Sequence, residues 1–110
     1  MIFDSDGSTT VVFQEDISLP KFLNNLNAGY EKIKHDHIIV NLFSFSGLTA
    51  NDVMEFRQLS DTHRAADKSF VLVSDKVSYD EVPDHIIVVP TLQEAHDIIQ
   101  MEEIERDLDL

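Results

Sequence analysis

The sequence predicts an α/β fold, a mixed β-sheet with an amino-terminal hairpin and with helices packed on the sheet. Short β-branched runs at residues 38–42 and 70–73 are typical of strands covered on both faces. Between such runs, apolar residues recur at helical spacing, most clearly from Leu19 to Ile33. With 110 residues, of which 43% are hydrophobic, the chain can form one core, so we expect a single domain over residues 1–110.

The amino-terminal third predicts a hairpin followed by a helix. Residues 2–4 and 10–14 are expected to be short strands, joined by a turn in which Gly7 can adopt a positive φ. In the helix that follows, Ser18 can serve as N-cap and Pro20 falls in the first turn, where a missing N–H costs little.

The middle of the chain predicts a strand, a loop, a helix and a second strand. The strand is residues 38–42, and the loop ends at Thr49, which can cap a helix expected from about Ala50 to Ala66. The strand at residues 70–73 follows. If Val40 and Leu72 lie in adjacent central strands, both are buried.

The last third predicts a polar connection, a strand and an acidic helix. The connection at residues 74–84 contains Pro83 and has room for one helical turn at most. Residues 86–89, including Val88 of the buried layer, form the next strand, and a helix covers about residues 91–108, with Glu94 placed to complete a capping box with Thr91. The expected order is therefore β-β-α-β-α-β-β-α, with helices on the sheet.

Composition restricts the function. The formal charge of −13 opposes nucleic-acid binding and favours a protein partner with a basic surface. The chain has no cysteine, which removes thiolate chemistry and most structural zinc sites. It also has no apolar run that could span a membrane and no signal-peptide pattern, so we expect a cytoplasmic protein.

The loop after the strand at 38–42 is the best candidate for a partner surface, because α/β proteins place contacts at strand-to-helix loops. It has Gly47 but neither glycine-rich pattern that cradles phosphates. We therefore expect recognition, not catalysis, with no cofactor and no bound metal. The predicted contact residues are Phe43, Ser44, Phe45, Ser46, Gly47, Thr49, Asn51 and Asp52.

The order of elements and these local motifs resemble the STAS domain, the fold of bacterial anti-sigma-factor antagonists and of the cytoplasmic tails of sulfate transporters. The resemblance runs from the hairpin through residues 38–42 and 70–73 to the stretch from Val88 to Ala95. It implies a non-enzymatic regulatory module whose partner is an anti-sigma-type kinase or another basic protein. It also implies that the loop after the third strand and the start of the next helix form the contact surface.

Two features depart from that family. Where its switch-type members carry a phosphorylated serine within Asp-Ser-Ser-Gly, this chain has Thr49-Ala50-Asn51-Asp52, so we expect a constitutive module. Ser44, Ser46 and Thr49 remain alternative phosphorylation sites. The connection at 74–84 also leaves no room for the family's third helix. Similar short proteins of Bacteroidetes are sometimes labelled ribonuclease Z, but this chain lacks that enzyme's H-x-H-x-D-H cluster.

The main alternative is a small metal-dependent hydrolase or ribonuclease-associated protein that uses His35 and His37. His63 and His96 fall at helical spacing with apolar residues and are expected at the edge of the core. Carboxylates of the polar connection offer oxygen ligands for a divalent cation, but their spacing fits a solvated loop better. These residues are Asp75, Asp80, Glu81 and Asp84.

The acidic end of the chain is a second candidate surface. Residues 94–110 carry seven acids against the single base Arg106. Ile104, Leu108 and Leu110 are apolar in this segment, which predicts a docking role and a core that stays folded after truncation at Met101. Homodimerisation through the hairpin edge or this helix is a further alternative.

Overall fold

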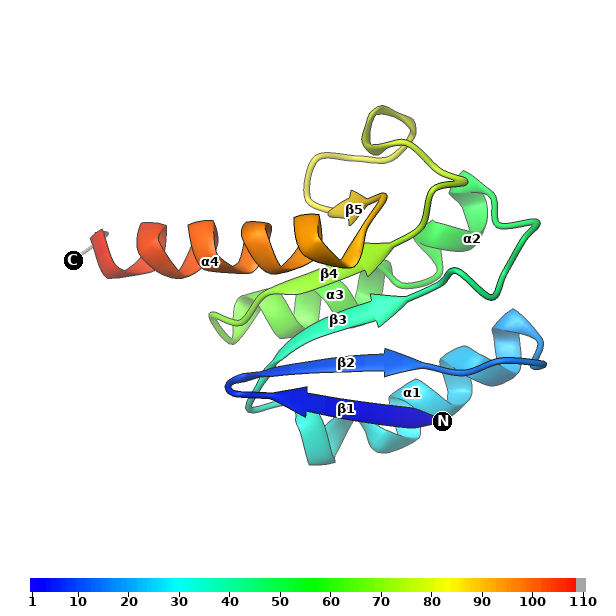
Figure 1. Ribbon diagram of the computed structural model, residues 1–110, viewed down its shortest axis with the longest axis horizontal. Coiled ribbons are helices and arrows are strands. Elements are labelled where there is room, and N and C mark those ends of the chain that lie inside the picture. Colours follow the sequence, from blue (N-terminus) through cyan, green and yellow to red (C-terminus); the bar gives the residue numbers. More distant parts are fainter. Residues whose placement is uncertain (109–110) are drawn as a thin grey trace.

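The computed structural model describes residues 1–108 and shows a mixed α/β fold built on one five-stranded sheet (Figure 1). The sheet order follows the chain, β1-β2-β3-β4-β5, with a hairpin at one edge and a short strand at the other. The elements are β1 (Ile2–Asp6), β2 (Thr9–Phe13), α1 (Leu19–Ile33), β3 (His37–Asn41), α2 (Ala50–Met54), α3 (Arg57–Ala65), β4 (Phe70–Val73), the single 3₁₀ turn η1 (Tyr79–Glu81), β5 (Val88–Val89) and α4 (Leu92–Leu108).

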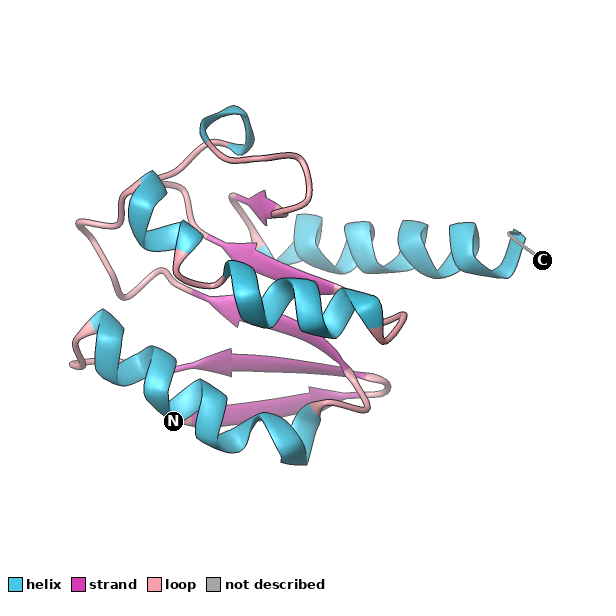
Figure 2. Cartoon of the chain, turned by 180° about the vertical axis from the view of Figure 1, so that it is seen from behind, coloured by secondary structure: helices cyan, strands magenta, loops and turns pink. Residues whose placement is uncertain are grey.

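The helices cover both faces of the sheet. β1 pairs antiparallel with β2, and β2, β3, β4 and β5 run parallel to one another. Because the crossovers between parallel strands have one hand, α1, α2 and α3 all lie on the same face (Figure 2). α4 follows the last strand and returns across the opposite face, where it packs chiefly on β3, β4 and β5.

The larger core layer lies beneath α1, α2 and α3. It confirms the predicted burial of Val40, Leu72 and Val88, which pair in register across β3, β4 and β5 and are at most 3% exposed. The smaller layer lies beneath α4 and joins Ile39, Val71 and Val73 to Ala95 and Ile99 of the helix. β3 and β4 are therefore covered on both faces, as their β-branched runs predict.

The hairpin turns as the sequence predicts, although β1 extends to Asp6 and β2 begins and ends one residue earlier than expected. Gly7 adopts a φ of +64°, which favours glycine. β1 packs against α1 through the ring of Phe3, which lies close to Gly29. A Cβ added to Gly29 would stand only 2.9 Å from Cζ of that ring. A residue larger than glycine in that helix would displace the ring.

Helix α1 confirms the prediction in detail. The Ser18 hydroxyl accepts a hydrogen bond from the Lys21 N–H, and the proline lies in the first turn. Phe22, Leu26 and Ile33 form the buried face.

The prediction of one helix from Ala50 to Ala66 is wrong, because α2 ends at Met54 and α3 begins at Arg57. The Glu55 N–H donates to the Asp52 carbonyl and the Phe56 N–H donates to the Val53 carbonyl, which closes α2 in a tight turn. Phe56 follows this turn and is fully buried, with its ring 6.3 Å from that of Phe22. The break lets this ring enter the core.

The strand predicted at residues 86–89 is shorter than expected. The Ile86 N–H donates to the Pro83 carbonyl in a turn, so only Val88 and Val89 pair with β4. The connection before it contains η1, in agreement with the prediction of a single helical turn.

Helix α4 has apolar residues on two sides. Ala95 and Ile99 face the sheet, whereas Met101, Ile104 and Leu108 are exposed. Leu110, the other apolar residue predicted to dock, lies outside the described residues. Within residues 1–108, no helix combines the length and the apolar character needed to cross a bilayer.

Candidate functional site

The predicted contact loop follows β3 at the carboxyl edge of the sheet, and its most exposed apolar side chain is Phe43, at 45% exposure. Two hydrogen bonds from side chains to the backbone hold this residue. The Phe43 N–H donates to Oδ1 of Asn41 across 3.0 Å, and the next residue, Ser44, donates through its hydroxyl to the Gln14 carbonyl across 2.8 Å. The aromatic ring is therefore presented from a fixed backbone.

The other residues of the loop divide between the core and the surface. The Phe45 ring lies edge-on to Phe22, with centroids 5.4 Å apart, and packs against the core. Ser46 and Gly47 are exposed, and Leu48 is buried. The structure thus leaves Phe43, Ser46 and Gly47 free to meet a partner.

Thr49 and Asp52 form a reciprocal capping box at the start of α2. The Thr49 hydroxyl accepts from the Asp52 N–H across 3.2 Å, and the Asp52 carboxylate accepts from the Thr49 N–H across 3.0 Å. Asn51, between them, is exposed. The capping function predicted for Thr49 is confirmed, and the Asp52 charge lies where a helix N-terminus stabilises it.

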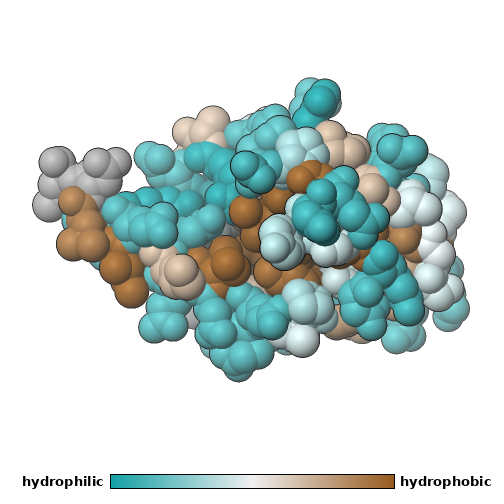
Figure 3. Space-filling model, turned by 90° about the horizontal axis from the view of Figure 1, so that it is seen from above, coloured by the Kyte–Doolittle hydropathy of each residue, from teal (hydrophilic) through white to brown (hydrophobic). Residues whose placement is uncertain are grey.

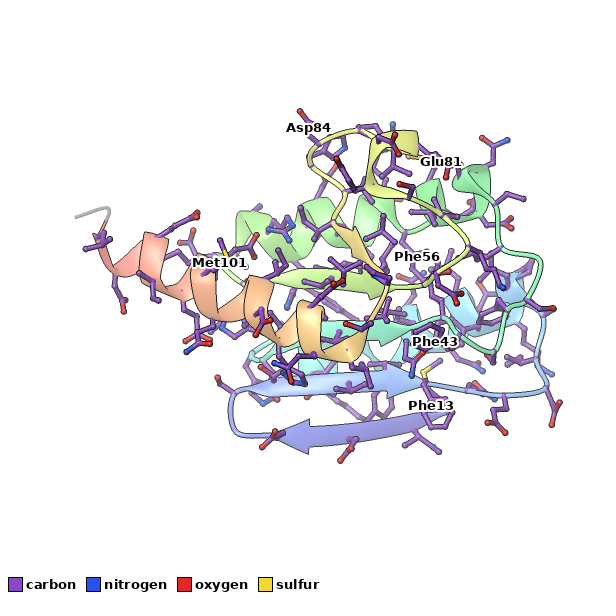
Figure 4. All side chains as sticks on the ribbon, turned by 45° about the horizontal axis from the view of Figure 1, so that its top comes forward. Phe13, Phe43, Phe56, Glu81, Asp84 and Met101 are labelled. Atoms are coloured by element: carbon purple, nitrogen blue, oxygen red, sulfur yellow. The ribbon has the colours of Figure 1, made fainter. Side chains whose placement is uncertain are left out.

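An uncovered part of the sheet lies beside Phe43. β1 and β2 extend beyond the strands on which α4 chiefly packs, and on that face Ile2 pairs with Phe13. Ile2 is 52% exposed and Phe13 is half-buried. Figure 4 shows Phe13 and Phe43 at the ends of neighbouring strands. This face and the loop therefore present aromatic and aliphatic side chains at one edge.

A groove that the sequence does not predict lies on the opposite side of the same carboxyl edge, between the connection 74–87, β5 and the first turns of α4. Its volume is about 740 Å³. Seen from above, apolar surface lies between hydrophilic side chains here (Figure 3). The apolar lining includes Val77, Ile86, Val88, Pro90 and Ile98. We call this cavity the β5 groove.

Carboxylates line the polar part of the β5 groove. They belong to Asp75, Glu81, Asp84 and Glu94, and they are accompanied by Lys76. The Glu81 carboxylate accepts the Ser78 N–H across 2.9 Å and so fixes η1. Figure 4 shows Glu81 and Asp84 on the connection that rises over β5. Three of the four acids noted in the sequence therefore gather around one cavity.

The histidines proposed for a metal site are separated by their contacts. His37 is buried, and its Nδ1 accepts the Ser69 N–H across 2.9 Å, so its Nε2 carries the proton and faces Glu103 at 3.2 Å. Burial lowers the pKa of His37 below its ordinary value. His35 is exposed and lies 3.8 Å from Asp36. Within residues 1–108, no three His, Asp or Glu side chains are grouped so as to hold a metal ion.

A second polar cluster fastens the distal half of α4 to the sheet. Glu102 accepts from the Ser69 hydroxyl across 2.6 Å and from Arg64 across 3.0 Å. Arg106 donates to the same Ser69 hydroxyl across 3.1 Å. These contacts lie at the amino ends of β3 and β4, opposite the contact loop. They indicate a structural role for a helix that the sequence analysis treated as a docking tail.

His63 was expected at the edge of the core but is fully buried. Its Nε2 lies 2.8 Å from the Asp36 carbonyl and its Nδ1 lies 2.8 Å from the Tyr30 hydroxyl. Burial lowers the pKa of His63 to about 4. His96 is half-buried, in agreement with a position at the core edge.

In comparisons with known proteins, the chain matches no protein-family model and no curated protein sequence.

Proposed function

We propose that this domain is a non-catalytic protein-interaction module of the cytoplasm, similar to the anti-sigma-factor antagonists of the STAS family. The single observation that carries the proposal is the exposed ring of Phe43 on a backbone held by hydrogen bonds. The partner of the domain is a protein with a basic surface, such as an anti-sigma-type kinase, because the chain carries a net charge of −13.

Phe43 has the properties of an interface anchor. Aromatic side chains contribute much of the binding energy at protein interfaces, and a backbone already held in place loses little entropy on binding. The bonds from Asn41 and Ser44 hold the backbone on both sides of the ring without covering it. The apolar pair Ile2 and Phe13 extends the same edge.

The same geometry supports a constitutive module. Asn51, which has no hydroxyl, is exposed at the position compared with the family's serine, and Asp52 already supplies a negative charge at the helix start. Thr49 uses its hydroxyl oxygen in the capping box, where a phosphate would be repelled by the neighbouring Asp52 carboxylate.

Metal-dependent hydrolysis is less well supported by the side chains that the alternative would use. Both ring nitrogens of His37 face protein partners, and His35 lies on the surface beside Asp36. A homodimer is also less well supported, because two copies of so acidic a chain repel each other.

The decisive experiment is affinity capture from the native cytoplasm with three forms of the domain. We expect a protein retained by the wild type and by Met101→Ala to be lost with Phe43→Ala. Met101 is the matched control, because it is also an exposed apolar residue, at 56%, but lies on α4 away from this edge (Figure 4). Equal retention by Phe43→Ala would contradict the proposal, provided that circular dichroism shows all three forms to be folded.

A further inference from the structure

We infer that the β5 groove binds a basic segment of the protein partner, with an apolar side chain of that segment on the groove's floor and lysine or arginine side chains at its rim. The inference rests on the proposed function, because it specifies the chemistry of the partner. It assigns a role to a cavity formed by the connection 74–87, β5 and α4.

The floor of the groove fits an apolar side chain. Val89 of the edge strand and Ile98 of α4 are partly exposed and line it from two elements, and Pro90 lies between these elements in the chain. The volume of about 740 Å³ is within the range of about 300–1,000 Å³ found for ligand pockets. One or more aliphatic side chains can therefore leave water there, which favours binding.

The rim selects positive charge. Four carboxylates line the groove, against the single ammonium group of Lys76, which lies 3.8 Å from its neighbour Asp75 on the surface. Glu81 is held by the backbone of η1, whereas Asp84 and Glu94 reach the groove from opposite walls, the connection and the first turn of α4. A cation between these walls meets acids from both sides, and an anionic ligand is repelled.

The position of the groove indicates a polypeptide occupant. Asn41 pairs with Val73, and the Leu42 N–H donates to the Val73 carbonyl, so the chain enters the contact loop beside the start of the connection 74–87. Phe43 and the rim residue Asp75 thus follow adjacent strands at one edge. A partner that covers Phe43 can extend a segment into the groove, whereas a small molecule would occupy the groove alone.

The probes are three fluorescein-labelled peptides of equal length, built from lysine and leucine, from lysine and serine, or from glutamate and leucine. Fluorescence anisotropy at physiological ionic strength, where distant charges are screened, measures affinity. We expect the lysine–leucine peptide to bind, the lysine–serine peptide to bind at least about tenfold more weakly for lack of the apolar contact, and the glutamate–leucine peptide not to bind. Amide NMR shifts should then map to residues 74–98.

Two double variants distinguish binding at the β5 groove from non-specific electrostatic attraction to the acidic chain. Asp84→Asn with Glu94→Gln removes two charges at the groove and should weaken binding by about fivefold. Glu105→Gln with Asp107→Asn removes the same two charges on the distal part of α4 and should leave affinity nearly unchanged. Both double variants have the same net charge, so their difference measures the position of the acids.

Three results would overturn the inference: no binding of the lysine–leucine peptide, equal weakening by the two double variants, or NMR shifts confined to residues 42–52. None of these bears on the capture experiment with Phe43→Ala. If the groove variant retains the captured partner while Phe43→Ala loses it, the proposed function stands and the groove assignment fails.

Discussion

The Tyr30 hydroxyl donates a hydrogen bond of 2.8 Å to Nδ1 of His63, which joins α1 to α3 behind the sheet. The direction of this bond follows from the other ring nitrogen. Nε2 lies 2.8 Å from the Asp36 carbonyl, which can only accept, so Nε2 carries the proton and Nδ1 receives one from Tyr30. The imidazole is therefore neutral and uses both nitrogens.

This arrangement predicts a loss of stability as the pH falls. The folded-state pKa of His63 is about 4, below the ordinary value of 6.5. Between these two pH values the unfolded chain binds a proton at His63 that the folded chain does not bind. As the pH falls, this residue therefore lowers the free energy of unfolding by at most about 1.4 kcal/mol per pH unit. His37, whose pKa burial also lowers, acts in the same direction.

Urea unfolding between about pH 5 and pH 7 measures this slope, since most carboxylates stay ionised there in both states. The variant His63→Gln cannot take up the proton, so its free energy of unfolding should depend less steeply on pH, although its stability at neutral pH is lower. An identical slope in the variant would show that His63 does not contribute.

A charge in the central layer should unfold the domain. Val40 of β3 is fully buried in the larger core layer, and Val40→Asp would place an unpaired carboxylate there, at a cost of several kcal/mol. Thermal unfolding followed by circular dichroism tests this. Ile2→Asp is the matched control, because it puts the same charge on the exposed edge strand and should remain folded.

The distal half of α4 should be required for stability, contrary to the expectation from the sequence that truncation after Met101 leaves the core folded. Truncation removes Glu102, which accepts from Ser69 and Arg64, together with Arg106. Glu102→Ala alone leaves buried donors without acceptors and should cost about 1–3 kcal/mol. Chemical denaturation checks this, with exposed Glu105→Ala as the control. A Glu102→Ala variant as stable as the control would assign the cluster no structural role.

The contact loop should not be a phosphorylation switch. Intact-mass analysis of protein purified from its native host with phosphatase inhibitors is expected to show the unmodified mass. A substantial phosphorylated fraction on Ser44, Ser46 or Thr49 would contradict a constitutive module.

In binding assays corrected for stability, Asp52→Asn should change partner affinity more than Thr49→Val does, because both variants weaken the cap but only Asp52→Asn removes the charge.

The elements that the sequence predicts well are those with local signals. The buried run of β4 and the cap of α1 at Ser18 depend on neighbours in the chain, and the structure has both. The break between α2 and α3 was not predictable in this way, because helical periodicity continues through Phe56. The reason for the break is the distant ring of Phe22, against which Phe56 packs.

The candidate site shows the same limit. The position of Phe43 after a buried strand was sufficient to place it at the sheet's carboxyl edge. The hydrogen bond that holds Ser44, next to this ring, comes from the carbonyl of Gln14 after β2 and could not be predicted from the loop alone. The β5 groove requires Glu94 to face the connection that carries Asp84, and only the path of α4 determines this.

Helix α4 follows β3, β4 and β5 in the chain and covers one face of them, which has consequences during synthesis. While α4 is still inside the ribosome, the strands with Ile39, Val71 and Val73 can already pair, but their outer face is bare. A stalled or prematurely ended chain would expose adjacent β-branched strands, the kind of surface on which nascent proteins aggregate. Emergence of α4 from the ribosome covers this face and protects the strands from neighbouring chains.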